Sequence, residues 1–151
     1  MQVRASGIQH VGIPVREMQR SLQFYREAFA IEPDFVADGS GDELSRAVGV
    51  PDADLSFAFL RVGDSILELL EYRNPRGRDY DRRNCDVGAV HIAFEVDDIQ
   101  EAYETLRSKG VEFNAPPLAI EEGPLAGCSF AYFTDPDGVQ LEIFETASGA
   151  G

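Results

Sequence analysis

The sequence GAVHIAFEVDDIQEAYETL at Gly88–Leu106 decides the fold, because it repeats an earlier stretch of the same chain. The earlier stretch is GIQHVGIPVREMQRSLQFY at Gly7–Tyr25, and superposing the two places His91 on His10. In both copies, alternating apolar residues typical of a strand lead through a short turn into helix-like spacing. A repeat that carries strand and helix in the same order predicts two similar modules.

The repeat continues further along the chain, where Leu67–Glu71 (LELLE) matches Leu141–Glu145 (LEIFE). Gly63-Asp64 predicts a tight hairpin in the first copy, and Asp135–Gly138 (DPDG) predicts a turn in the second. We therefore predict an α+β fold of two βαβββ modules, each with a mixed sheet and a helix on one face. The predicted boundaries within a single domain at 1–151 are module 1 at 7–72, a polar linker at 73–86 and module 2 at 87–146.

The elements are predicted in the same order in both modules. Asp98 followed by Glu101 resembles a capping box, and Gly110 predicts the end of the second helix. Asp38–Asp54 is predicted as a loop with a helical turn at Glu43–Val48. Helices are predicted at Glu17–Ala30 and from Ile99 to Leu106, and strands at Ile8–Val15, Asp34–Ala37, Leu55–Val62, Ser65–Glu71, Gly88–Val96, Val111–Asn114, Cys128–Thr134 and Val139–Glu145.

Composition bounds the class of protein. A chain of 151 residues with 44% hydrophobic content has enough apolar surface for one compact core. A net charge of -14 argues against nucleic acid or an anionic membrane as a partner, because both need clustered cations. The sequence has neither an apolar run long enough to span a bilayer nor a signal-peptide pattern. Cys85 and Cys128 form no metal or redox motif, so we expect reduced thiols in a cytoplasmic protein.

The chain has two histidines, His10 and His91, at equivalent positions of the repeat. Random placement would produce this match about once in 150 cases. The small residues beside them, Gly12 in one copy and Ala89 and Ala93 in the other, leave space in front of the sheet.

Glu68 and Glu142 are equivalent residues on the last strand of each module. A lone carboxylate on such a face costs several kcal/mol unless it is paired or metal-bound. The plainer interpretation is that the histidines are core residues whose hydrogen bonds are made within the protein, and that the glutamates lie at sheet edges. Their matched placement favours a site for one divalent ion, Zn²⁺, Ni²⁺, Co²⁺, Mn²⁺ or Fe²⁺, with positions left open for water.

A resemblance to the vicinal oxygen chelate superfamily rests on four segments that cover both modules. This group contains glyoxalase I, methylmalonyl-CoA epimerase, extradiol dioxygenases, and bleomycin- and fosfomycin-resistance proteins. The segments are HVGIPVREMQRSLQFYREAF from His10, SILELLEY from Ser65, HIAFEVDDIQEAYETLRSKGVEF from His91 and YFTDPDGVQLEIFE from Tyr132. The resemblance implies a cup-shaped sheet around one metal, with His10, Glu68, His91 and Glu142 as ligands.

This ligand set resembles the glyoxalase I and epimerase-like pattern, which implies a metal-dependent isomerase, epimerase or lyase. Its substrate would be a small α-oxygenated carbonyl or acyl compound, turned over through a metal-stabilised enediolate. An Fe²⁺ ring-cleaving dioxygenase is an alternative, although that branch uses two histidines and one glutamate, so Glu68 counts against it. A drug- or metabolite-binding protein without turnover is the second alternative. The resemblance and the uncovered sheet edges also favour a homodimer.

Glu142 is our first candidate for the proton-transfer base and Glu68 the second, because a glutamate displaced from the metal regains basicity. If both fail, the loop residues Glu43, Glu121 and Glu122 are the next candidates. Glu71 and Glu145 alternate away from the ligand face and are expected to be solvated. Five arginines cluster in the linker region, and we favour a solvated linker as their role. The alternative is that they bind a carboxylate or phosphate of the substrate. They are Arg73, Arg76, Arg78, Arg82 and Arg83.

Overall fold

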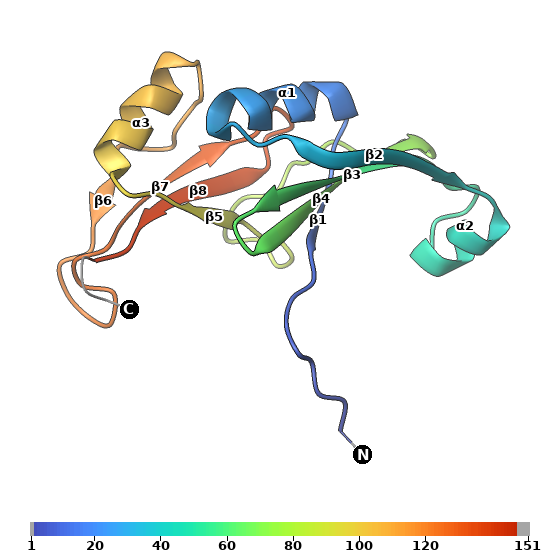
Figure 1. Ribbon diagram of the computed structural model, residues 1–151, viewed down its shortest axis with the longest axis horizontal. Helices are drawn as coiled ribbons and strands as arrows, with labels where there is room; N and C mark the ends of the chain where they lie inside the picture. The colour runs from blue at the N-terminus through green and yellow to red at the C-terminus, as the bar shows by residue number, and fades with distance from the viewer. Residues whose placement is uncertain (1, 148–151) are drawn as a thin grey trace. The chain divides into compact units, whose positions relative to one another are not determined.

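The computed structural model describes residues 2–147 and divides the chain into two compact units (Figure 1). Unit 1 extends to Asp79 and unit 2 starts at Tyr80. The elements of unit 1 are β1 (Val11–Pro14), α1 (Met18–Phe29), β2 (Pro33–Ser40), α2 (Asp42–Val48), β3 (Asp54–Val62) and β4 (Ser65–Asn74). Those of unit 2 are β5 (Ile92–Glu95), α3 (Ile99–Ser108), β6 (Leu118–Ala119), β7 (Ser129–Thr134) and β8 (Gln140–Glu145).

Each unit has one four-stranded mixed sheet. The strand orders are β1-β4-β3-β2 and β5-β8-β7-β6, so the first and last strands of each unit are neighbours. These neighbours run parallel, and the remaining pairs are antiparallel. The structure therefore confirms the predicted α+β fold and the βαβββ order. The helical turn predicted at Glu43–Val48 is present as α2.

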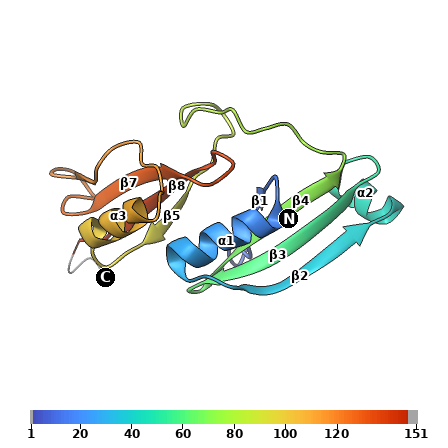
Figure 2. The ribbon, with the colours of Figure 1, turned by 90° about the horizontal axis from the view of Figure 1, so that it is seen from above.

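One face of each sheet is covered by a helix, which the ribbon shows most clearly from above (Figure 2). The α1 helix packs on β3 and β4 through Met18, Leu22 and Tyr25, which recur at helix spacing and are buried. The α3 helix packs on β7 and β8 through Ile99, Tyr103 and Leu106. Because side chains alternate along a strand, residues on the other face point away from the helix. We call this the open face.

Glu71 and Glu145 do not lie free in solvent, so the expectation for these two residues was wrong. A carboxylate oxygen of Glu71 accepts a hydrogen bond of 2.7 Å from the Met18 backbone N–H, and Glu145 accepts one of 2.7 Å from Ile99. Both donors are in the first turn of a helix, where backbone N–H groups lack helical partners. Each last strand thus holds the start of its own unit's helix.

The strand predicted at Val111–Asn114 is reduced to one isolated bridge between Phe113 and Phe133. The following residues include Pro116 and Pro117, which have no N–H to donate, so pairing resumes only at β6. In unit 1, β2 extends to Ser40 rather than ending at Ala37, because its residues up to Ser40 pair with β3. No helix within residues 2–147 is long and apolar enough to cross a membrane.

Candidate active site

His10 and Glu68 form the first of two pairs. His10 directly precedes β1, one residue outside the strand that was expected to carry it, and Glu68 lies in β4. The His10 Nε2 and Glu68 Oε2 atoms are 3.1 Å apart. Gly12 is the cross-strand neighbour of Glu68, and a Cβ there would lie 3.5 Å from Glu68 Oε2 and 3.2 Å from a Leu70 methyl group. The glycine therefore keeps the space beside the carboxylate clear.

His91 and Glu142 form the equivalent pair in unit 2. His91 directly precedes β5, Glu142 lies in β8, and the His91 Nε2 and Glu142 Oε2 atoms are 3.0 Å apart. Ala93 is the cross-strand neighbour of Glu142, as Gly12 is of Glu68. The His91 side chain is 42% exposed and that of Glu142 only 9%, so a half-exposed histidine lies beside a buried carboxylate.

Burial raises the pKa of the Glu142 carboxyl, while the neighbouring His91 and a hydrogen bond from Tyr132 act in the opposite direction. Tyr132 is the cross-strand partner of Glu142, and its hydroxyl lies 3.2 Å from the His91 Nε2 atom. Burial, together with the Glu142 charge, raises the pKa of the Tyr132 hydroxyl, which stays protonated at neutral pH. It remains available as a hydrogen-bond donor.

Tyr132 and Phe130 lie on the open face, because their cross-strand partners are Glu142 and Phe144. The sequence left open whether they belong to the core or to a site. The contact between Tyr132 and the His91–Glu142 pair was missed entirely. The available signal was the register of the two hairpins, which places Tyr132 opposite Glu142 as Phe59 is placed opposite Glu68.

The donor atoms of the two pairs suit a divalent cation of intermediate softness. Each pair offers one imidazole nitrogen and one carboxylate, the ligand types that Zn²⁺ and related ions accept. Among residues 2–147 no three or more His, Cys, Asp or Glu side chains stand together as a complete metal cluster. The structure thus places His10 beside Glu68 and His91 beside Glu142. That all four side chains bind one metal ion is a proposal.

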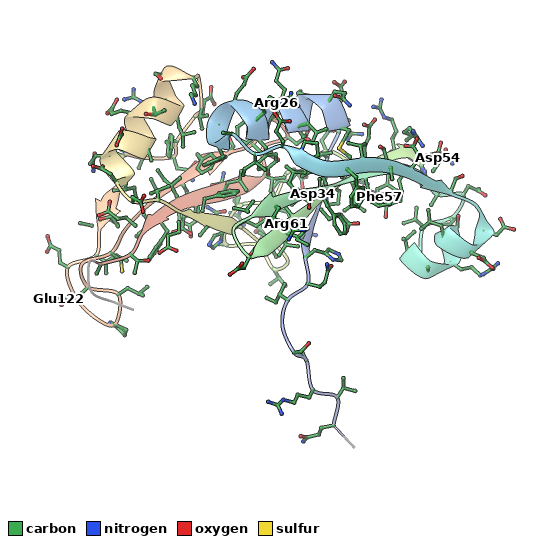
Figure 3. The ribbon with its side chains drawn as sticks, viewed as in Figure 1. Arg26, Asp34, Asp54, Phe57, Arg61 and Glu122 are labelled. Carbon is green, nitrogen blue, oxygen red and sulfur yellow. The ribbon has the colours of Figure 1, made fainter. Side chains whose placement is uncertain are left out.

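The other predicted base candidates are exposed. Glu43 lies in the first turn of α2, and Glu121 lies in the loop between β6 and β7. Glu122 follows in the same loop (Figure 3). None of the three belongs to either His–Glu pair.

Three of the five linker-region arginines have partners close by. Arg73 pairs with Asp54 at 2.6 Å and with Asp38 at 3.0 Å, joining the ends of β2, β3 and β4. Arg83 pairs with Asp86, and Arg82 donates to the Val87 carbonyl. These contacts favour the structural interpretation over a substrate-anion site for Arg73, Arg82 and Arg83.

The family model for the glyoxalase/bleomycin resistance protein/dioxygenase superfamily matches residues 7–143. A 2-epi-5-epi-valiolone epimerase from Actinomyces sp. is 36% identical over 97% of this chain and 82% of its own length. A probable lactoylglutathione lyase from Synechocystis sp. is 30% identical over 92% of this chain and 95% of its own length.

A solved structure with the same fold is the fosfomycin resistance protein FosX from Listeria monocytogenes, in complex with Mn(II) and sulfate. It superposes with a TM-score of 0.64 at 18% identity and covers 96% of both chains. Proteins with this fold therefore include one that binds a divalent metal ion.

Proposed function

Because the chain belongs to the glyoxalase/bleomycin resistance protein/dioxygenase superfamily, we propose that it is a metal-dependent epimerase, isomerase or lyase. The proposed substrate is a small carbonyl or acyl compound with an oxygen on the adjacent carbon. The observation that carries the proposal is the pair of equivalent His–Glu contacts at 3.1 and 3.0 Å. The names of the epimerase and lyase relatives support the class of reaction.

The proposed ligands of one divalent ion are His10, Glu68, His91 and Glu142. When bound, such a cation polarises the substrate carbonyl and so makes the proton on the neighbouring carbon more acidic. The histidines serve only to hold the ion, because a metal-bound imidazole nitrogen has no free lone pair for a proton. The glutamates are therefore the side chains left to move protons at this site.

Glu142 is the proposed general base, which accepts the proton from the substrate carbon through a carboxylate oxygen. It is the more buried of the two glutamates, with 9% of its side chain exposed against 18% for Glu68. Burial raises its pKa, which moves this carboxyl toward the range where acid–base catalysis is efficient. Glu68, its equivalent in unit 1, is the proposed partner that returns the proton in an epimerisation.

Deuterium exchange tests this proposal directly. The metal-loaded protein is incubated in deuterated water with 2-epi-5-epi-valiolone, the compound in the name of the epimerase relative, and proton NMR follows loss of the substrate C–H signal. We expect exchange in the wild type and its loss in Glu142→Gln with metal retained, because glutamine keeps a carbonyl ligand but accepts no proton. Oxygen uptake with a catechol instead of exchange would favour the dioxygenase alternative.

We also propose that the protein forms a homodimer. In the described part of the chain, β1, β2, β5 and β6 are edge strands, each with one side that no strand of its own sheet pairs with. Such edges are commonly covered by a partner. Light scattering at several concentrations tests this, because a constant mass of 16.6 kDa would contradict the dimer.

A cytoplasmic location is proposed from the cysteines. Cys85 is exposed and Cys128 is buried, and both are free thiols. Fractionation of the source cells with antibody detection tests it, and recovery of the protein outside the cytoplasm would contradict it.

A further inference from the structure

The open face of the unit 1 sheet is apolar around Glu68. Phe59 is the cross-strand partner of Glu68, and the Phe35 ring lies 5.0 Å from the Phe59 ring. Phe59 is also 5.7 Å from the His10 ring, and Ile66 precedes Glu68 by two residues on the same face. Apart from the His–Glu pair, these side chains offer a substrate no hydrogen bonds. Figure 3 shows Phe57, which continues this apolar face along β3.

Polar residues hold the equivalent positions of unit 2. Tyr132 takes the place of Phe59, as the cross-strand partner of Glu142. Gln140 takes the place of Ile66, two residues before the glutamate. Asn114 lies beside Tyr132, to whose carbonyl it donates its backbone N–H at 2.9 Å, as Phe35 lies beside Phe59. The two His–Glu pairs thus stand in chemically different surroundings.

The side chain of Gln140 is held by its neighbours in one orientation. Its Oε1 atom accepts hydrogen bonds from Asn114 Nδ2 at 2.8 Å and from Asn84 Nδ2 at 3.2 Å. Both of these hydrogen bonds go to the carbonyl oxygen, so the Nε2 amino group, which has no hydrogen bond to the part of the chain at residues 2–147, keeps two N–H bonds for a ligand. A donor fixed in this way loses little rotamer freedom when it binds a ligand.

We propose that Asn114 and Gln140 select substrates that carry further hydroxyl groups near the reacting carbonyl, a small polyhydroxylated carbonyl compound. This inference rests on the proposed function, because it takes Glu142 as the residue at the reacting carbon. Gln140 and Glu142 are two residues apart on one strand, about 7 Å. A short polyol chain reaches from the carboxylate of Glu142 to the amide group of Gln140, whose N–H groups donate to hydroxyl oxygens.

The test compares binding of two ketones, L-erythrulose and 1-hydroxy-2-butanone, which lacks the two distal hydroxyl groups. NMR titration of the zinc-loaded protein gives both dissociation constants and follows the side-chain amide signals of Gln140 and Asn114. The variants are Asn114→Leu and Gln140→Leu, which keep side-chain size but remove the hydrogen-bonding atoms. Gln100→Leu is the matched control, the same substitution at an exposed position of α3.

We expect the wild type to bind L-erythrulose at least about tenfold more tightly than 1-hydroxy-2-butanone, since each hydrogen bond contributes about three- to tenfold. Gln140→Leu and Asn114→Leu should each reduce this preference by about threefold or more, while Gln100→Leu keeps it. An equal preference in all four proteins, or no preference or no binding in the wild type, would overturn the inference. Hydroxyl preference that depends on Asn114 and Gln140, without deuterium exchange, would support the hydroxyl selectivity of these two residues and overturn the proposed function.

Discussion

Tyr132 and Phe59 occupy equivalent positions, each directly across from the glutamate of a His–Glu pair, but only Tyr132 has a hydroxyl group. That hydroxyl lies 3.2 Å from the His91 Nε2 atom and also hydrogen-bonds to the Glu142 carboxylate. The two halves of the repeat therefore have the same pair of residues with different hydrogen-bonding surroundings. The Tyr132 hydroxyl favours the ionised form of Glu142, whereas Phe59 has no hydroxyl to offer Glu68.

Replacing Tyr132 by phenylalanine should raise the pKa of Glu142 further. The tyrosine hydrogen bond favours the ionised carboxylate, so its removal makes proton release harder. Titration of the Glu142 side-chain carboxyl by carbon NMR in the metal-free protein measures this directly. The fold should persist, because Phe59 occupies the same position in unit 1. A titration midpoint that stays the same or moves to lower pH would refute the assignment of this hydrogen bond.

Glu142→Gln should change how stability depends on pH in the metal-free protein. Burial raises the folded-state pKa of Glu142 above that of a glutamate in the unfolded chain, so the folded state keeps the proton to higher pH than the unfolded state. The wild type should therefore lose stability relative to the variant as pH rises from about 4.5 toward the folded pKa, and then run parallel to it. Urea unfolding of both proteins at several pH values is the measurement, and a constant difference would contradict the effect of burial.

Glu71→Ala and Glu145→Ala should each destabilise the protein by about 1 to 2 kcal/mol, because each removes the acceptor for a backbone N–H at the start of a helix. This corresponds to a fall in Tm of about 2 to 8 °C for a chain of this length. Glu104→Ala is the matched control, an exposed glutamate further along α3. Thermal unfolding in which both variants match the control would show that the two hydrogen bonds contribute nothing.

The repeat predicted most of the fold because the same helix spacing, turn residues and strand alternation occur in both halves of the chain. Helix spacing and turn residues placed α1, α3 and the two hairpins, and the strand alternation placed Ile13 and Val15 in the core. The strand expected at Val111–Asn114 was wrong in extent, since only one bridge forms there, and Pro116 and Pro117 beyond it have no N–H groups with which to extend the pairing. The composition of Val111–Asn114 alone did not indicate how far the strand pairing extends.

The candidate site was predicted in part for the same reason. Repeat equivalence matched His10 with His91 and Glu68 with Glu142 as four candidate site residues, and the structure places each histidine beside the glutamate of its own unit. The hairpin register could have placed Tyr132 opposite Glu142, although this contact was missed. The hydrogen bonds of Glu71 and Glu145 could not be predicted, because they depend on how the start of each helix packs on the last strand. Such contacts join residues far apart in the chain and leave no local pattern.

The most direct test of the central claim is the metal content of purified protein and of its histidine variants. The wild type, His10→Ala, His91→Ala and the double variant are dialysed against Zn²⁺ or Mn²⁺ and analysed for metal, with circular dichroism to confirm folding. We expect one ion per wild-type chain, a loss of about tenfold or more in affinity for each single variant, and no stoichiometric binding in the double variant. Full metal occupancy in folded His10→Ala and His91→Ala would contradict a site built from the two His–Glu pairs.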